Sequence, residues 1–218
     1  MDFYSTVEYA KKKYFPNLNI KFKNNSFLMK ILSYLLFFNK KFMTQYATSS
    51  NNSIVYFPSE DFIRLRSISS IVILLHELIH VNDSIKLNYY FYSFLYMLPQ
   101  SLILFTIPLM FFSLKIGIIL TIICLLPLPA YFRMRFERKA YFASLYVLQA
   151  LANKLNYNSN LDKRKDNFLA SFKDSSYYWM WILPNLNKQF DDATTKIKNG
   201  EKPYDDPIFD ILDDLVKN

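Results

Sequence analysis

The feature that most restricts the fold is a long apolar stretch in the middle of the chain. Between Leu87 and Phe132 the only charged residue is Lys115, which separates mostly apolar runs of 21 residues at 94–114 and 17 residues at 116–132. A helix needs about 20 apolar residues to cross roughly 30 Å of hydrocarbon, so the second run is slightly short. The stretch predicts a transmembrane two-helix hairpin over residues 88–132. The alternative is an unusually apolar helix pair in a soluble core.

The residues that border this stretch agree with a membrane hairpin. Lys115 and Gly117 suit a tight turn at its tip. Tyrosines that fit an interfacial belt stand near its ends, at Tyr89, Tyr90, Tyr92, Tyr96 and Tyr131. Basic residues gather at its base, namely Lys86, Arg133, Arg135, Arg138 and Lys139. Because basic residues favour the cytoplasmic side, we expect both chain termini to lie there.

A metal-binding motif comes directly before the apolar stretch. Both histidines of the chain occur in His76-Glu77-Leu78-Ile79-His80. On a helix, side chains four residues apart lie on the same face, so His76 and His80 can bind one ion. Glu77 is then the candidate general base, which takes a proton from water that the metal activates. We expect this helix to begin at Ser67 or Ser69 and to end near Lys86.

The sequence leaves the third ligand open between two carboxylates. A catalytic zinc site (Zn2+) needs three protein ligands and one open position. No third histidine exists, and Cys124 lies inside the apolar stretch. Glu137 is favoured because a ligand from a second helix approaches the ion from a different direction. Asp83, one turn beyond His80, is the alternative ligand, or it accepts a hydrogen bond from a ligating imidazole.

Tyrosines are the candidate donors to an oxyanion that forms during hydrolysis. Tyr141 follows Glu137 on the same segment, and Tyr177 and Tyr178 belong to an aromatic cluster at 175–183. Ordinary packing is the alternative role for each of these side chains.

Outside the motif and the apolar stretch, the chain predicts a mainly α fold with a small β-hairpin. Only two glycines occur, which favours long helices. Aromatic and β-branched residues at 41–48 and 54–57 flank a turn-forming Ser/Asn segment and predict the β-hairpin. Helices are expected at 1–15, 27–38, 133–155, 167–173, 185–199 and 208–216. The resulting organisation is an N-terminal half (1–87), the apolar hairpin (88–132) and a C-terminal half (133–218).

The net charge of +8 leaves two interpretations. It fits attraction to an anionic membrane surface, or a solvated surface that aids solubility. Nucleic-acid binding is not expected, because the basic residues are scattered, with short runs such as Lys11, Lys12 and Lys13, and no binding motif accompanies them. Cys124 is the single cysteine, so an intramolecular disulfide is excluded.

The motif and its downstream glutamate resemble known peptidases. His76–Asp83, HELIHVND, resembles the gluzincin-type peptidases, and especially the mitochondrial intermembrane-space family that matures an ATP synthase subunit. Glu137–Ala140 is similar to the Glu-x-x-Ala helix of that family and of ImmA/IrrE-type peptidases. A wider pattern over residues 40–185 resembles metallopeptidases encoded by large tailed bacteriophages. The resemblance implies a zincin-like fold, with His76, His80 and Glu137 on zinc and Glu77 as the base.

These observations predict a membrane-associated, zinc-dependent metallopeptidase that hydrolyses peptide bonds. Its expected partners are a peptide or protein substrate and the lipid bilayer, and the phage resemblance adds the virion as a possible location. The soluble families have no apolar hairpin between motif and glutamate, so the substrate stays open. The main alternative is a structural or membrane-perforating phage protein with a vestigial zinc site. A peptidase that acts on a repressor is a further alternative.

Overall fold

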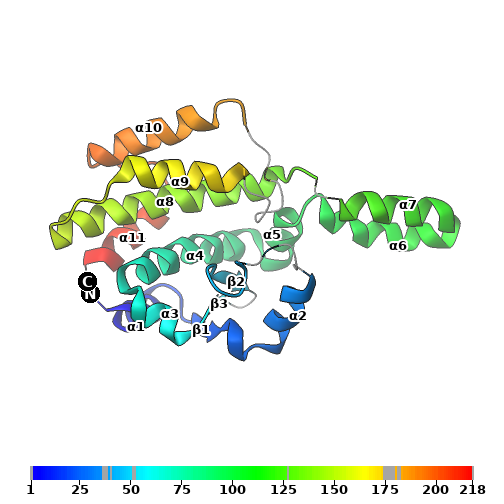
Figure 1. The fold of residues 1–218 in the computed structure, drawn as a ribbon, viewed down its shortest axis with the longest axis horizontal. Coiled ribbons are helices and arrows are strands. Elements are labelled where there is room, and N and C mark those ends of the chain that lie inside the picture. Colours follow the sequence, from blue (N-terminus) through cyan, green and yellow to red (C-terminus); the bar gives the residue numbers. More distant parts are fainter. Residues whose placement is uncertain are drawn as a thin grey trace.

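Helices form most of the chain, and a three-stranded sheet completes the part that the structure describes (Figure 1). This computed structural model describes residues 2–35, 39, 41–50, 53–126, 128–173, 180 and 183–217. The helices are α1 (Phe3–Lys13), α2 (Phe27–Leu35), α3 (Glu60–Leu65), α4 (Ser67–Leu87), α5 (Tyr89–Tyr96), α6 (Ile103–Phe112), α7 (Leu114–Leu125), α8 (Tyr131–Leu155), α9 (Leu161–Lys173), α10 (Leu186–Lys198) and α11 (Ile208–Lys217), with 3-10 turns η1 (Lys23–Asn25) and η3 (Gln100–Leu102). The predicted mainly α character is confirmed.

The small sheet contains the expected hairpin and one strand that was not expected. Strands β1 (Asn19–Phe22), β2 (Thr48–Ser50) and β3 (Ile54–Phe57) lie in the order β1-β3-β2. β3 pairs antiparallel with β2 and parallel with β1. The prediction of a strand over 41–48 is wrong for most of its length, because residues 41–45 form turns. The buried Lys23 Nζ donates a hydrogen bond of 2.8 Å to the carbonyl of Phe42 in this turn segment, and the Phe42 side chain packs with Met29 and Tyr56.

Helix α4 is the centre of the hydrophobic core. Leu74, Leu75, Leu78 and Ile79 are fully buried, as expected for a helix that is apolar on most sides. Among the described residues, α4 is the one helix with the length and apolar character to cross a membrane by itself. Its burial against α8 and α1 gives it a core position. The same core cluster includes residues of α10 and α11, so it joins segments from both sides of the apolar stretch.

The apolar stretch forms two short helices that project from the body (Figure 1). A single helix over 94–114 was expected, but the chain bends by 110° between Tyr89–Tyr96 and Gln100–Phe112. Pro99 lies at this break, and proline cannot donate the backbone hydrogen bond that a continuing helix requires. Beyond the bend, α6 and α7 lie side by side. Their 10 and 12 residues correspond to lengths of about 15 and 18 Å.

Residue burial in this helix pair is the reverse of that in a soluble core. The buried residues of α6 and α7 are Thr106, Gly117 and Cys124. The large apolar side chains lie outside, and Phe111 and Phe112 are each 88% exposed. The hydroxyls of Thr106 and Thr121 lie 2.8 Å apart across the pair. Small and hydroxyl-bearing residues between helices are typical of helix packing in lipid.

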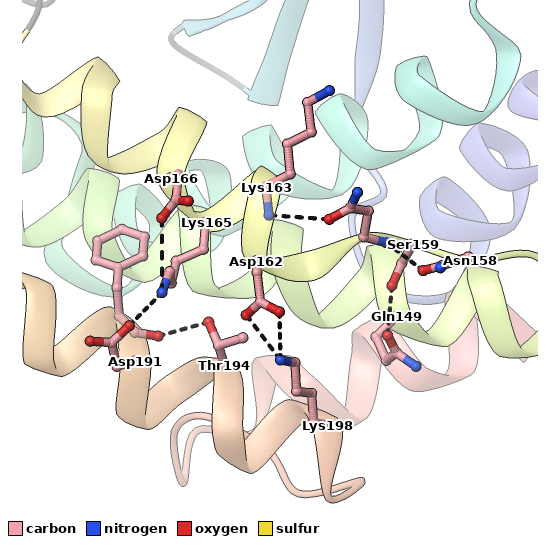
Figure 2. A network of polar contacts seen from close by, with 12 residues as sticks. Gln149, Asn158, Ser159, Asp162, Lys163, Lys165, Asp166, Asp191, Thr194 and Lys198 are labelled. Carbon is pink, nitrogen blue, oxygen red and sulfur yellow. Dashed lines mark hydrogen bonds and ion pairs between the residues drawn. The ribbon is translucent and has the colours of Figure 1, made fainter.

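Helices α9 and α10 cover α8 on the opposite side of the body from α1 (Figure 1). Figure 2 shows the surface ion pairs between them, in which Lys198 binds Asp162 at 2.8 Å and Lys165 binds Asp191 at 2.5 Å. Such exposed pairs contribute at most about 1 kcal/mol each. The expected helix over 167–173 begins earlier, at Leu161, which is buried in the core.

Candidate metal centre

The two histidines and Glu137 converge where α4 and α8 pack together. His76 and His80 stand one turn apart on α4, and Glu137 projects from α8. The Nε2 atoms of the histidines are 3.3 Å apart. Glu137 Oε2 lies 3.4 Å from Nε2 of His76, and Glu137 Oε1 lies 3.4 Å from Nε2 of His80. The three residues form a group that could hold a metal ion.

The spacing of these atoms fits a tetrahedral ion. Zinc bonds of about 2.0–2.1 Å to nitrogen and oxygen imply about 3.3 Å between neighbouring ligand atoms. The two Nε2 atoms, 3.3 Å apart, have this separation, and each histidine lies 3.4 Å from a different oxygen of the Glu137 carboxylate. Glu137 Oε2 is also buried and has no hydrogen-bond partner among the described residues. Since a buried polar atom without a partner is costly, this oxygen fits a coordination bond.

Each of the three candidate ligands contacts one hydroxyl group. His76 Nδ1 lies 3.0 Å from Ser144 Oγ, which itself donates to the Ala140 carbonyl. The serine must therefore accept from the imidazole N–H, and Nε2 is left with its lone pair. His80 Nδ1 lies 2.9 Å from the Tyr92 hydroxyl. The Tyr96 hydroxyl donates a hydrogen bond of 2.6 Å to Glu137 Oε1.

The electrostatics of the group favour a bound positive charge. Burial alone would lower the pKa of His80, but the neighbouring Glu137 carboxylate outweighs it and raises this pKa to about 9. Burial alone would raise the pKa of Glu137, but His80 and His76 hold it well below its usual range. The pocket therefore keeps a carboxylate ionised and stabilises a cation beside it. A metal ion would replace the proton on His80.

A cavity of about 510 Å³ opens beside this group and includes Glu77 in its wall. Leu28, Met29 and Leu32 of α2 form an apolar wall. Thr48 and Ser49 of β2, which lies at the edge of the sheet, form another part. Further lining comes from α5, through Tyr89, Tyr92, Ser93, Tyr96 and Met97. The cavity thus combines three convergent ligand groups, a carboxylate and an exposed strand edge.

Asp83, the alternative third ligand, lies outside this group. Its Oδ1 accepts a hydrogen bond of 2.6 Å from Lys139, which also binds Asp206 at 2.8 Å. The position beside a ligand imidazole that the sequence suggested for Asp83 is occupied by the hydroxyls of Ser144 and Tyr92. The ion pair with Lys139 fastens α4 to α8.

The candidate oxyanion donors are not brought together in the described part of the chain. The buried Tyr141 ring packs against His76, with 5.1 Å between ring centroids, and against Phe168 at 4.7 Å. The described lining of the cavity does not include Tyr141. Tyr177 and Tyr178 lie outside the described residues.

Several residues of the site carry no obvious signal in the sequence. Tyr92 and Tyr96 were interpreted as part of an interfacial belt, although their four-residue spacing just after the histidine motif places both on one helix face. Ser144 lies one helical turn after Ala140 and was not singled out. Lys23 is fully buried, and burial lowers its pKa to about 7, while the negative charge of Glu77 opposes this shift.

The comparisons with known proteins return no relatives. No protein-family model matches the chain, and neither a curated protein nor a solved structure does.

Proposed function

We propose that this protein is a zinc-dependent metallopeptidase held at a membrane by its apolar hairpin. The observation that carries the proposal is the convergence of His76, His80 and Glu137, whose ligand atoms lie within 4.8 Å of one another beside a cavity that also contains Glu77. Two imidazoles and one glutamate form a common ligand set for catalytic zinc. The resemblance of HELIHVND and Glu137–Ala140 to zinc peptidases supports the same assignment.

In this proposal the residues of the cavity have separate roles in peptide hydrolysis. Zinc, when bound, supplies the Lewis acidity that makes water nucleophilic at neutral pH. Glu77 takes the proton from the attacking water and delivers it to the leaving amine. The free edge of β2 pairs with the backbone of an extended substrate, because its Thr48 and Ser49 line the cavity. The apolar wall of α2 favours a large apolar side chain of the substrate.

The membrane part of the proposal is supported by the reversed burial pattern of α6 and α7. An exposed apolar surface around a Gly and Thr interface is expected when lipid is the solvent. The two helices are about 15–18 Å long, so they reach about half of the 30 Å hydrocarbon layer. The cleavage site would then lie close to the bilayer, where membrane-proximal peptides are available. A virion setting rests on the phage resemblance.

The Glu77→Gln variant of the full chain tests the peptidase function. We expect the zinc-loaded wild type to cleave fluorescein-labelled casein, a chelator to abolish cleavage and added zinc to restore it. Glu77→Gln should keep its zinc and lose at least about 100-fold in rate, the usual contribution of a general base. Glu60→Gln, at an exposed position on α3, is the matched control and should cleave normally.

A membrane-perforating protein with zinc as a structural staple is the second candidate function, favoured by the exposed apolar surface of α6 and α7. It predicts leakage of dye from lipid vesicles that is equal for wild type and Glu77→Gln. If vesicles leak dye and no zinc-dependent cleavage is found, the membrane-perforating function replaces the peptidase proposal.

A further inference from the structure

Helix α5 presents two hydroxyl groups to the candidate metal ligands. Tyr92 and Tyr96 stand four residues apart, so both side chains lie on the same face of the helix. The Tyr92 hydroxyl is 2.9 Å from His80 Nδ1, and the Tyr96 hydroxyl is 2.6 Å from Glu137 Oε1. One short helix therefore contacts a ligand from α4 and a ligand from α8.

These two contacts fix how each ligand faces the ion. When the Tyr92 oxygen accepts the Nδ1 proton of His80, the Nε2 lone pair is directed toward Glu137 and His76. When Tyr96 donates to Oε1, the carboxylate plane is held and Oε2 is left for coordination. Both partners are neutral phenols, whereas Asp83, a carboxylate one turn beyond His80 on α4, is engaged by Lys139. The ligands are thus oriented without further negative charge.

Helix α5 is itself held firmly against α8. The Tyr96 carbonyl accepts a hydrogen bond of 3.2 Å from Arg133 Nε, and the Tyr92 ring packs on Phe136 with centroids 4.6 Å apart. Just after Tyr96, at its C-terminal end, α5 continues through η3 into α6, the first helix of the apolar pair. The segment that orients the ligands is therefore also the root of the projecting hairpin.

We propose that Tyr92 and Tyr96 are positioning residues that place His80 and Glu137 for the metal ion, which makes the root of the apolar hairpin part of the metal centre. The inference rests on the proposed metal site but not on peptidase activity. Outer-shell partners of this kind typically change metal affinity by about 10- to 100-fold when removed.

The test is a titration of the metal-free, full-length protein with Co2+, whose visible absorption reports coordination geometry. Tyr92→Phe and Tyr96→Phe should each weaken Co2+ binding about 10- to 100-fold, and Tyr96→Phe should also alter the absorption spectrum. Tyr90→Phe is the matched control, because Tyr90 lies on the same helix and is 75% exposed. It should bind Co2+ as the wild type does.

The outcomes separate this inference from the proposed function. If both variants bind Co2+ with wild-type affinity and spectrum, the positioning role is overturned while the metal site stands. If the wild type gives no Co2+ spectrum, the metal site itself fails. Should a phenylalanine variant not fold, 3,5-difluorotyrosine at position 96 keeps the ring and strengthens the hydroxyl as a donor. A spectrum unchanged by this replacement would overturn the inference equally.

Discussion

At the scale of single residues, the choice between Glu137 and Asp83 depends on which carboxylate already has a partner. Asp83 is neutralised by Lys139, whereas Glu137 faces both imidazoles and leaves Oε2 without a hydrogen bond. We predict that Glu137→Ala loses bound zinc, while Asp83→Ala retains one equivalent. Elemental analysis after dialysis measures the zinc content of both variants. Zinc lost from Asp83→Ala, with the fold intact by circular dichroism, would transfer the ligand role to Asp83.

Lys23 is a second residue whose surroundings lead to a measurable prediction. Burial lowers its pKa to about 7, so the unfolded chain, with a lysine pKa near 10.5, binds the proton more tightly than the folded chain. The free energy of unfolding should therefore rise between about pH 7 and pH 10. Below pH 7 the amine is charged in both states, and the cost of burying the charge is fully present.

Replacing Lys23 by methionine isolates this contribution. Lys23→Met removes the titrating group, so the rise in stability between pH 7 and pH 10 should be smaller than in the wild type. Urea denaturation in detergent at several pH values measures the free energy of unfolding. The exposed Lys21→Met is the control. An identical pH dependence in wild type and Lys23→Met would contradict a lowered pKa.

Residue spacing predicted the metal group but not the groups that orient it. The pair His76 and His80 needs only helical periodicity, and the need for a third ligand favoured Glu137 while leaving Asp83 as the alternative. The roles of Tyr92 and Tyr96 depend on α5 folding back beside α4, and this reversal occurs at Asn88, whose φ of 64° is left-handed. Asparagine tolerates that conformation, but the sequence does not show toward which face the next helix turns.

At the scale of elements, the packing of α6 on α7 depends on Gly117. A Cβ atom at this position would lie 2.3 Å from Met110 Cγ and 2.9 Å from Met110 Cα. The side chain can move, but the backbone atom belongs to α6, so a larger residue must push the helices apart. Overpacking of this kind typically costs about 1–3 kcal/mol.

We therefore predict that Gly117→Val loosens the hairpin and weakens the contact between the Thr106 and Thr121 hydroxyls. Hydrogen exchange in detergent should become faster across α6 and α7 and stay unchanged in α4. Ile118→Val, at an exposed neighbouring position, is the control and should exchange as the wild type does. Unchanged exchange in Gly117→Val would show that the two helices are not closely packed.

Helix limits were predicted well where the chain carries its own start and stop signals. α4 begins at Ser67, one of the two expected starts, although Arg66 is its N-cap, and α10 ends at Lys198, within one residue of the expected limit. The sheet was harder, because β1 has four residues and pairs with a strand more than thirty positions away. The prolines of the apolar stretch predict kinks, but the sequence does not show that the bend at Pro99 is as large as 110°, since membrane helices also tolerate proline with little bending.

At the scale of the whole molecule, the apolar hairpin and the metal centre are connected through the chain itself. The two ligand-bearing helices, α4 and α8, are joined in sequence only through α5, η3, α6 and α7. A lipid layer or protein that binds the hairpin therefore also restrains α4 and α8, the two helices that carry the candidate ligands. In the proposed membrane setting, the net charge of +8 would add attraction to an anionic lipid surface.

The membrane assignment is tested by placing charge on the part of the hairpin that is most exposed. Phe111 and Phe112, each 88% exposed, can be changed to glutamate without disturbing a core. Because an acidic side chain in hydrocarbon costs about 2.5–3.5 kcal/mol, the double variant should lose most binding to lipid vesicles in a flotation assay. Leu65→Glu on α3, which is 78% exposed, is the matched control and should bind normally. If the Phe111→Glu/Phe112→Glu protein floats with vesicles as the wild type does, the apolar surface of α6 and α7 faces something other than lipid, and a second protein chain becomes the better candidate.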